Sequence, residues 1–327
     1  MSQTFLSNLQ ESLHKLLGND PNVIVMGEDI LDPYGGAFKV TQGLSTAFPQ
    51  QVLTTPISEA GIIGVANGMA LRGMKPIVEI MFGDFITLGA DQIINYAAKF
   101  QAMYQSNEEY HLVIRMAVGG GRGYGPTHSQ TLEKLFLGIP NVKIISPSIY
   151  HDPGKLLETA VNEQGPVLFL EHKLLYSKRN PSTFSASSDD VAYPTIKVSN
   201  TDQNRIDITI LAYGGALWVE PLLERLTTEE IWAEVILPAS LNHTHYPLAE
   251  ASIRKSKYAV IVEEGAGPFG WGSQVSHSLT SACWGQLRKP IRSITSMNTI
   301  IPTARDLEQQ FLPTVDKIEQ AIYEVLL

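Results

Sequence analysis

The sequence predicts an α/β protein made of two doubly wound domains with mostly parallel sheets. Short runs of apolar, often β-branched residues alternate with longer amphipathic or small-residue stretches, which is typical of parallel strands joined by helical crossovers. The length of 327 residues exceeds what one hydrophobic core usually fills. A polar segment over residues 177–205 interrupts the alternation and divides the chain.

The first domain is expected over residues 1–176. Its N-terminal segment repeats apolar residues from Phe5 to Leu17 at helical spacing, unlike the continuous apolar core of a signal peptide. The apolar runs that follow are near-continuous, as in strands buried on both faces. The predicted strands are Val23–Met26, Ile77–Phe82, Leu112–Met116, Val142–Ser146 and Val167–Glu171. The predicted helices are Gly61–Leu71, Ala90–Tyr104, Leu132–Leu137 and Gly154–Asn162.

Residues 177–205 are expected to be a linker, because they are polar and have no apolar period. A second, smaller domain of the same class is expected over residues 206–327. Its predicted strands are Ile208–Ala212, Ala233–Leu237, Ala259–Glu263 and Ile291–Ile294. Its predicted helices are Glu220–Arg225, Ala249–Ser256, Gln274–Cys283 and Val315–Val325.

The composition argues against several classes of partner. A net charge of −9 argues against nucleic acid and membrane surfaces, because both favour clustered Lys and Arg. No run of about twenty apolar residues occurs, so no membrane span is expected. Cys283 is the only cysteine, which excludes an intrachain disulfide and fits a reducing cytoplasm. The charged fraction of 17% is low, which suggests that other subunits cover part of the surface.

Glu59 lies in the segment Thr55–Gly61, where a strand end is expected to run into a helix start. In open α/β sheets ligands bind outside the carboxyl ends of the strands, which makes this carboxylate a candidate site residue. The alternative is that Glu59 only complements the dipole of the helix N-terminus, with Ser58 as the cap. Phe82 and Phe85 end the next expected strand, where they either offer a ring face to a flat ligand or pack in the core.

A glycine-rich loop, Val118–Gln130, follows another expected strand and contains His128 near its end. It is a poor dinucleotide fingerprint, since Tyr124 stands where the third glycine belongs. Such a loop can let a ligand approach the backbone closely, can move as a lid, or can have no role. His128 can transfer protons or bind an anion near neutral pH, or can be a solvated surface histidine.

Seven short segments occur in order along the chain. They are MGED at Met26–Asp29, GGAFKVTQGL at Gly35–Leu44, TPISEAG at Thr55–Gly61, EIMFGDF at Glu79–Phe85, DQIINYAAK at Asp91–Lys99, HSQ at His128–Gln130 and VEEG at Val262–Gly265. Together they resemble the β subunits of pyruvate, branched-chain and acetoin dehydrogenase E1 components, which are transketolase-like thiamine diphosphate enzymes. The resemblance covers nearly the whole chain and is more specific in its first half. It implies a pyrimidine-binding domain followed by a transketolase C-terminal-like domain.

The resemblance implies roles for individual residues. Glu59 matches the glutamate that hydrogen-bonds N1′ of the cofactor's aminopyrimidine, and Phe85 matches the ring stacked on it. Ile57 and Met81 match positions that contact the same ring, and His128 matches a catalytic histidine near the reactive carbon. Some relatives also hold a structural potassium ion through main-chain carbonyls, at positions that match Leu112, Ala160, Val161, Glu163 and Gly165.

The resemblance also implies partners. Thiamine enzymes hold magnesium and diphosphate through a GDG motif followed by an asparagine, and no GDG occurs in this sequence. An α subunit is therefore expected to hold most of the magnesium site in an α2β2 tetramer. The implied reaction is oxidative decarboxylation of a pyruvate-like 2-oxo acid with acyl transfer to lipoamide, carried by an acyltransferase E2.

The second half of the chain departs from the family pattern. The relatives carry a DLRTL-like segment and then Pro-Leu-Asp, whereas this chain has EVILPASLN at Glu234–Asn242 and then Pro-Leu-Ala at Pro247–Ala249. Because this domain can dock the acyltransferase, two alternatives stay open. One is half of a split transketolase or acyloin-type carboligase in a biosynthetic pathway, and the other is a noncatalytic scaffold paralogue.

Overall fold

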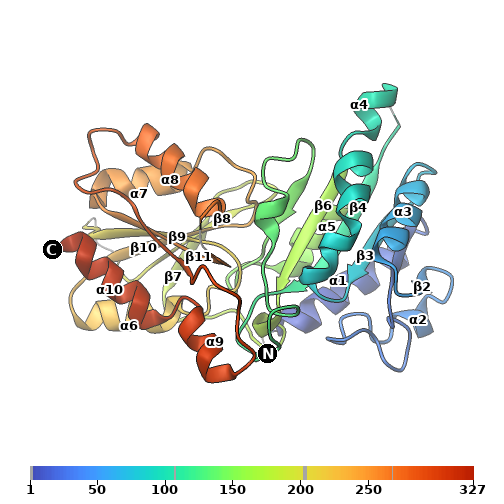
Figure 1. Ribbon diagram of the computed structural model, residues 1–327, viewed down its shortest axis with the longest axis horizontal. Coiled ribbons are helices and arrows are strands. Elements are labelled where there is room, and N and C mark those ends of the chain that lie inside the picture. The colour runs from blue at the N-terminus through green and yellow to red at the C-terminus, as the bar shows by residue number, and fades with distance from the viewer. Residues whose placement is uncertain (1–2, 107, 202–204, 267) are drawn as a thin grey trace. The chain divides into compact units, whose positions relative to one another are not determined.

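The chain forms two compact α/β units, each built on a six-stranded sheet (Figure 1). The computed structural model describes residues 3–106, 108–201, 205–266 and 268–327. The first unit comprises Met1–Val118, Leu135–Pro147 and Asp152–Arg179, and the second comprises Gly119–Lys134, Ser148–His151 and Asn180–Leu327. The predicted fold class of two α/β units with mostly parallel sheets is confirmed.

All strands of the first sheet are parallel, in the order β2-β1-β3-β4-β6-β5. Every residue of β1, β4 and β6 is buried, which explains the continuous apolar runs in the sequence. The strands are β1 (Val23–Gly27), β2 (Val52–Thr54), β3 (Lys75–Ile80), β4 (His111–Val118), β5 (Lys143–Ile145) and β6 (Gly165–His172).

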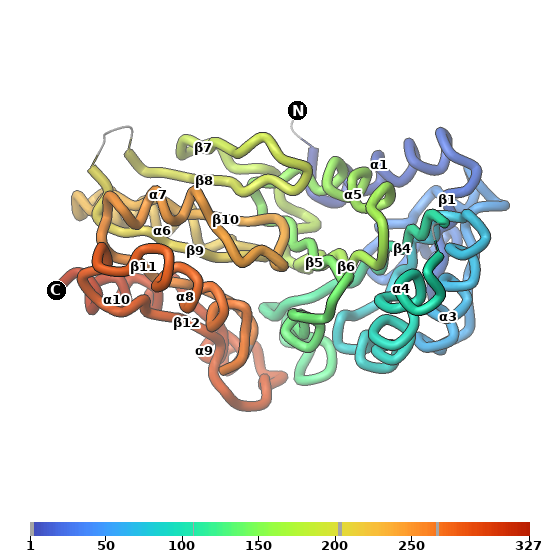
Figure 2. Tube along the Cα trace, turned by 90° about the horizontal axis from the view of Figure 1, so that it is seen from above, coloured from blue at the N-terminus to red at the C-terminus, as the bar shows by residue number. Residues whose placement is uncertain are grey.

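Helices cover both faces of this sheet (Figure 2). Helix α1 (Phe5–Asn19) packs beside α5 (Pro153–Val161) on one face, and α3 (Glu59–Ala70) lies on the other with the 3₁₀-helix η1 (Gly83–Gly89) against it. The short α2 (Leu44–Ala47) precedes β2.

The helix predicted over Ala90–Tyr104 is interrupted. It consists of a π-helical turn, η2 (Gln92–Ala97), followed by α4 (Phe100–Tyr104). The helix predicted over Leu132–Leu137 is only a 3₁₀ turn, η3 (Glu133–Leu135), because six residues before a left-handed Gly138 are too few to propagate a helix.

The centre of the first sheet holds a buried ionic cluster. Arg115 of β4 donates to both carboxylate oxygens of Glu171, at 2.7 and 2.8 Å, and to Glu79 at 3.0 Å. The hydroxyl of Tyr176 donates to Glu171 at 2.8 Å, and burial raises the pKa of this tyrosine well above its usual value. Because Arg115 and Glu171 are almost fully buried, removing Arg115 would leave Glu171 without its cation, and removing Glu171 would leave Arg115 with Glu79 alone.

The second sheet has the order β12-β11-β9-β10-β8-β7 and is parallel except for its last two strands, which pair antiparallel. Helices α7 and α8 lie on one face, and α6 and α10 lie on the other (Figure 1). The strands are β7 (Ser185–Ser188), β8 (Thr195–Ser199), β9 (Ile208–Ala212), β10 (Ala233–Pro238), β11 (Ala259–Ala266) and β12 (Arg292–Ser296). The helices are α6 (Val219–Thr228), α7 (Pro247–Ser256), α8 (Trp271–Ala282), α9 (Arg305–Phe311) and α10 (Val315–Leu326).

Strands β7 and β8 lie inside the segment for which the sequence predicts a linker. Strand β8 pairs with β10 and buries Ile196 and Val198, whereas all four residues of the serine-rich β7 are exposed. The backbone of β8 pairs with β10, and that of β7 pairs with β8. This pairing makes the polar residues strands although their sequence has no apolar period. Residues 202–204 of the predicted linker lie outside the described residues.

None of the helices in the described part of the chain combines the length and the apolar character needed to cross a membrane.

Candidate active site

The topology of the first sheet brings candidate residues to one edge. Strand β1 lies between β2 and β3, so the chain reverses its winding direction at β1. Ligands of open α/β sheets bind at such a switch point, outside the carboxyl ends of the strands. Glu28 directly follows β1, Glu59 follows β2 by five residues, and Phe85 follows β3 by five residues.

Glu59 is the first residue of α3 and is 6% exposed. Ser58 occupies the N-cap position, as in the alternative reading of Glu59, but its side chain makes no capping hydrogen bond within the described residues. Among the residues that the structure describes, none forms a hydrogen bond or ion pair with the Glu59 side chain. Neither Glu59 oxygen is among the fully buried, unpaired side-chain atoms of the described residues, so this carboxyl is open to a hydrogen bond from a ligand.

Glu28 is a second acidic residue at this edge, and it was not predicted from the sequence. It is 8% exposed, and its Oε1 atom is buried without a hydrogen-bond partner in the described ranges. Burial is the largest cause of the raised pKa of Glu28, and the negative charge of Glu59 is the second. Its place in the MGED segment, directly after the first predicted strand, was the available signal.

Aromatic and apolar residues follow the ends of β2 and β3 at the same edge. Phe85 is half-buried in η1, with its ring centroid 6.1 Å from that of Phe82 at an interplanar angle of 79°. Element η1 packs on the first turn of α3, where a Cβ atom added to Gly89 would be 3.5 Å from the Glu59 carbonyl oxygen. Ile57 is 83% exposed and Met81 is half-buried. The edge thus offers a carboxyl and apolar surface to a flat, nitrogen-containing ring.

His128 belongs to the second unit, in the loop between β4 and η3. Its side chain is half-buried, and its Nδ1 atom is 2.9 Å from the hydroxyl of Thr127. The backbone N–H of His128 donates to the Gly125 carbonyl, and that of Gly119 donates to the Gln130 carbonyl, each at 3.3 Å. One hydrogen bond therefore joins the two ends of the loop, and the other closes a turn over Gly125–His128.

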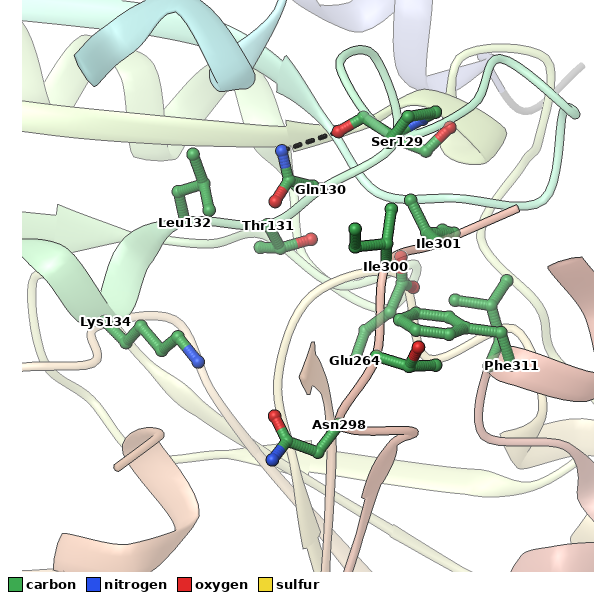
Figure 3. Close-up of a pocket in the computed structure, with 13 residues that line it drawn as sticks. Ser129, Gln130, Thr131, Leu132, Lys134, Glu264, Asn298, Ile300, Ile301 and Phe311 are labelled. Atoms are coloured by element: carbon green, nitrogen blue, oxygen red, sulfur yellow. Dashed lines mark hydrogen bonds between the residues drawn. The ribbon is translucent and has the colours of Figure 1, made fainter. Parts of the chain in front are cut away.

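A cavity of about 390 Å³ lies beside this loop within the second unit (Figure 3). Ser129–Leu132 line one side, and Ile300, Ile301 and Phe311 line the other. The hydroxyls of Ser129 and Thr131 are buried without hydrogen-bond partners in the described part of the chain. The volume of the cavity and its lining of polar and apolar residues are those of a small-molecule pocket.

Glu133 carries the most perturbed carboxyl of this region. Its Oε1 accepts a hydrogen bond of 2.6 Å from the Tyr213 hydroxyl, and its Oε2 is buried with no partner among the residues that the structure describes. Burial raises the pKa of Glu133 to about 7, and the charge of Glu263 adds to the increase. Glu133 was not predicted from the sequence, because the residues that perturb it, Tyr213 and Glu263, belong to the distant region of β9 and β11.

No group of three or more His, Cys, Asp and Glu side chains in the described ranges could hold a metal ion. The five predicted potassium positions gather where α5 ends and where β4 and β6 begin. Carbonyl groups at a helix C-terminus lack intrahelical partners and suit a cation. Two of these carbonyls are already engaged, since that of Glu163 accepts a hydrogen bond of 2.8 Å from His111 and that of Ala160 accepts one of 3.2 Å from the Glu163 N–H.

The sequence matches two families over most of its length. Residues 3–178 match the family described as "Transketolase, pyrimidine binding domain", and residues 198–318 match "Transketolase, C-terminal domain".

Three curated relatives are each 33% identical to this chain. They are the mitochondrial pyruvate dehydrogenase E1 component subunit beta-2 of Oryza sativa subsp. japonica (96% of this chain, 83% of the relative), the acetoin:2,6-dichlorophenolindophenol oxidoreductase subunit beta of Cupriavidus necator (96% and 94%) and the 2-oxoisovalerate dehydrogenase subunit beta of Bacillus subtilis (98% and 98%). A solved structure described as "Split gene transketolase, inactive beta4 tetramer" shares the fold, with a TM-score of 0.71, 21% identity, and coverage of 99% of this chain and 98% of its own.

Proposed function

The chain belongs to the transketolase-like family that includes the β subunits of the pyruvate and 2-oxoisovalerate dehydrogenases, and from that premise we propose that it is the β subunit of an E1-type 2-oxo acid dehydrogenase. It would act with an α subunit in the oxidative decarboxylation of a pyruvate-like 2-oxo acid. The acyl group would pass to a lipoyl group carried by an acyltransferase.

The observation that carries this proposal is a half-built site at the carboxyl edge of the first sheet. Glu59 is largely buried and has no hydrogen-bond partner among the described residues, while apolar side chains at the ends of the same strands can cover a flat ring. The described residues contain no cluster of acidic side chains for a metal ion, and the sequence contains no GDG motif. These features fit the pyrimidine half of a thiamine diphosphate site, with the diphosphate and magnesium held mainly by the α subunit.

In this proposal Glu59 shares a proton with N1′ of the aminopyrimidine, and Phe85, Ile57 and Met81 hold the ring. Thiamine diphosphate, when bound, would supply a nucleophilic carbon for the 2-oxo group and a thiazolium ring that accepts the electron pair released with carbon dioxide. Burial and the charge of Glu59 raise the pKa of Glu28, which favours a neutral Glu28 beside the carboxyl that would face N1′.

His128 would bind the substrate carboxylate or move a proton at the carbon that carries the acyl group. Its Nδ1 atom lies 2.9 Å from the Thr127 hydroxyl, a contact that would help to orient the ring. His128→Gln should lower kcat by about 100-fold, within the usual range for a lost general acid or base.

The exposed apolar residues of α3 and its preceding turn support an obligate partner. Ile57 is 83% exposed and Val65 is 58% exposed. The exposed Gly61 and Gly68 have no side chains, so another chain can approach the helix backbone closely. We propose that this surface contacts the α subunit in an α2β2 tetramer. A cytoplasmic location and a potassium ion at the end of α5 are part of the same proposal. Replacing potassium with choline should then lower the Tm.

The test is calorimetric binding of thiamine diphosphate and magnesium, on this chain alone and on the chain coexpressed with an α-type subunit. Binding only in the coexpressed complex, with decarboxylation lost in Glu59→Gln, supports the half-site. Tight binding by the chain alone would contradict it. Absence of binding in both preparations would favour a noncatalytic scaffold.

The acceptor needs a separate measurement, because the segment Glu234–Asn242 departs from the family pattern. Products are to be analysed with and without a lipoyl domain in the same reaction. Acylation of the lipoyl group supports the dehydrogenase. Ketol formation from an added aldehyde, without acylation, would identify a carboligase.

A further inference from the structure

The glycine-rich loop before His128 has one defined backbone shape. Its alternate residues Gly119, Gly121, Gly123 and Gly125 all have positive φ, at 89°, 89°, 73° and 78°. Side chains other than glycine rarely adopt this region. Alternation of left-handed residues turns successive N–H groups into a concave anion-binding surface.

Two carboxylates of the second unit accept hydrogen bonds from this loop. Glu264, in β11, accepts from the Gly120 N–H at 2.6 Å, and Glu308, in α9, accepts from the Gly123 N–H at 2.6 Å. Glu308 is fully buried, and its other oxygen would be only 3.1 Å from a Cβ atom added to Gly120. The Glu308 carboxylate is thus enclosed by the loop that it binds.

The loop also packs closely on the segment before α9. A Cβ atom added to Gly125 would be 2.7 Å from the Thr303 hydroxyl, and one added to Gly123 would be 3.2 Å from the Thr303 carbonyl. The close approach of Gly123 and Gly125 to Thr303 therefore leaves this part of the loop little space to open as a lid.

We propose that Glu308 and Glu264 are positioning residues that fix the glycine-rich loop and, through it, His128. Hydrogen bonds to ionised carboxylates are about twice as strong as neutral ones, which suits a loop that lacks side-chain packing of its own. The same bonds would shape the cavity, since Glu264 and the loop residues Pro126 and Ser129 line it. The part that concerns catalysis rests on the proposed role of His128.

The test uses trypsin, because the exposed Arg122 lies between the two bonded glycines. Cleavage after Arg122 reports local opening of the loop on the full chain and needs no activity. Glu308→Ala should raise the rate of this cleavage by about tenfold, the factor expected for loss of one charge-assisted hydrogen bond. Glu308→Gln keeps an acceptor for the Gly123 N–H and should stay within about threefold of the wild-type rate.

Asp306→Ala is the matched control, because it removes an exposed carboxylate from the same helix without loop contact in the described structure. Thermal unfolding of all variants separates local opening from global unfolding. In the complex with the α subunit, Glu308→Ala should lower kcat by about tenfold with KM within about twofold, and Glu308→Gln should restore kcat.

Unchanged cleavage at Arg122 in Glu308→Ala would overturn the inference. Faster cleavage with unchanged kcat, while His128→Gln is inactive, would overturn the positioning role. If His128→Gln keeps full activity, the proposed role of His128 fails, and faster cleavage in Glu308→Ala still supports a loop held by the two carboxylates.

Discussion

The pH dependence of stability should report the buried carboxyl of Glu133. Its pKa is raised from 4.5 to about 7, with burial as the largest cause. The unfolded chain therefore loses this proton at a lower pH than the folded chain does. Protonated Glu133 therefore contributes to the free energy of unfolding. This contribution is fully present below pH 4.5, is lost as the pH rises through about 7, and is absent above that value.

The magnitude follows from the two pKa values. Each tenfold change in proton affinity corresponds to about 1.4 kcal/mol, so about 3 kcal/mol is lost between the two pH limits. Glu133→Gln stays neutral at every pH and keeps an acceptor for the Tyr213 hydroxyl. Between pH 4.5 and pH 8, the stability of this variant relative to the wild type should rise by about 3 kcal/mol.

The assay is thermal unfolding of the wild type and Glu133→Gln at half-unit steps from pH 4.5 to pH 8. For a domain of this size, the predicted change corresponds to a relative Tm increase of about 6–12 °C. Glu224→Gln, at an exposed position on α6, is the control and should show no such trend. A Tm difference that stays constant over this pH range would refute the assignment of a neutral, buried Glu133.

Three further substitutions test the packing of the two units, each by the Tm and by urea unfolding. Glu171→Ala should lower the stability of the first unit by about 3–5 kcal/mol, because the buried Arg115 loses its bidentate carboxylate partner. A loss below about 1 kcal/mol would contradict this reason. Tyr176→Phe removes a single donor to the same carboxylate and should cost about 1.5–3 kcal/mol, so a cost equal to that of Glu171→Ala would be unexpected. Gly125→Ala should destabilise the second unit by about 1–3 kcal/mol, because its φ of +78° and the Thr303 hydroxyl both oppose a side chain, whereas an unchanged Tm would show that the loop adapts.

The elements predicted well are those with a strong local pattern. Strand β9 has the predicted bounds Ile208–Ala212, and β1, β4 and β6 differ from prediction by a few residues at their ends. Continuous apolar runs locate such strands, because central parallel strands are buried on both faces. Strands β7 and β8 lack that signal, since an antiparallel edge pair needs only partners for its backbone and few buried side chains.

The candidate site was predictable in part. The carboxyl-end rule pointed to Glu59 from the order of strand and helix signals, and the resemblance supplied its proposed role. Glu133 was missed because its perturbed pKa arises from burial beneath strands that are distant in the sequence. Its local surroundings are those of an ordinary polar turn.

The sequence by itself determined the fold class, the family, and the absence of a GDG motif for diphosphate and magnesium. These properties depend on local periodicity and on the identity of residues in short segments. Only the tertiary structure decided that Glu264 and Glu308 hold the glycine-rich loop, across 144 and 185 residues of sequence. Contacts at such separations follow from how the strands and helices pack, and no local pattern encodes them.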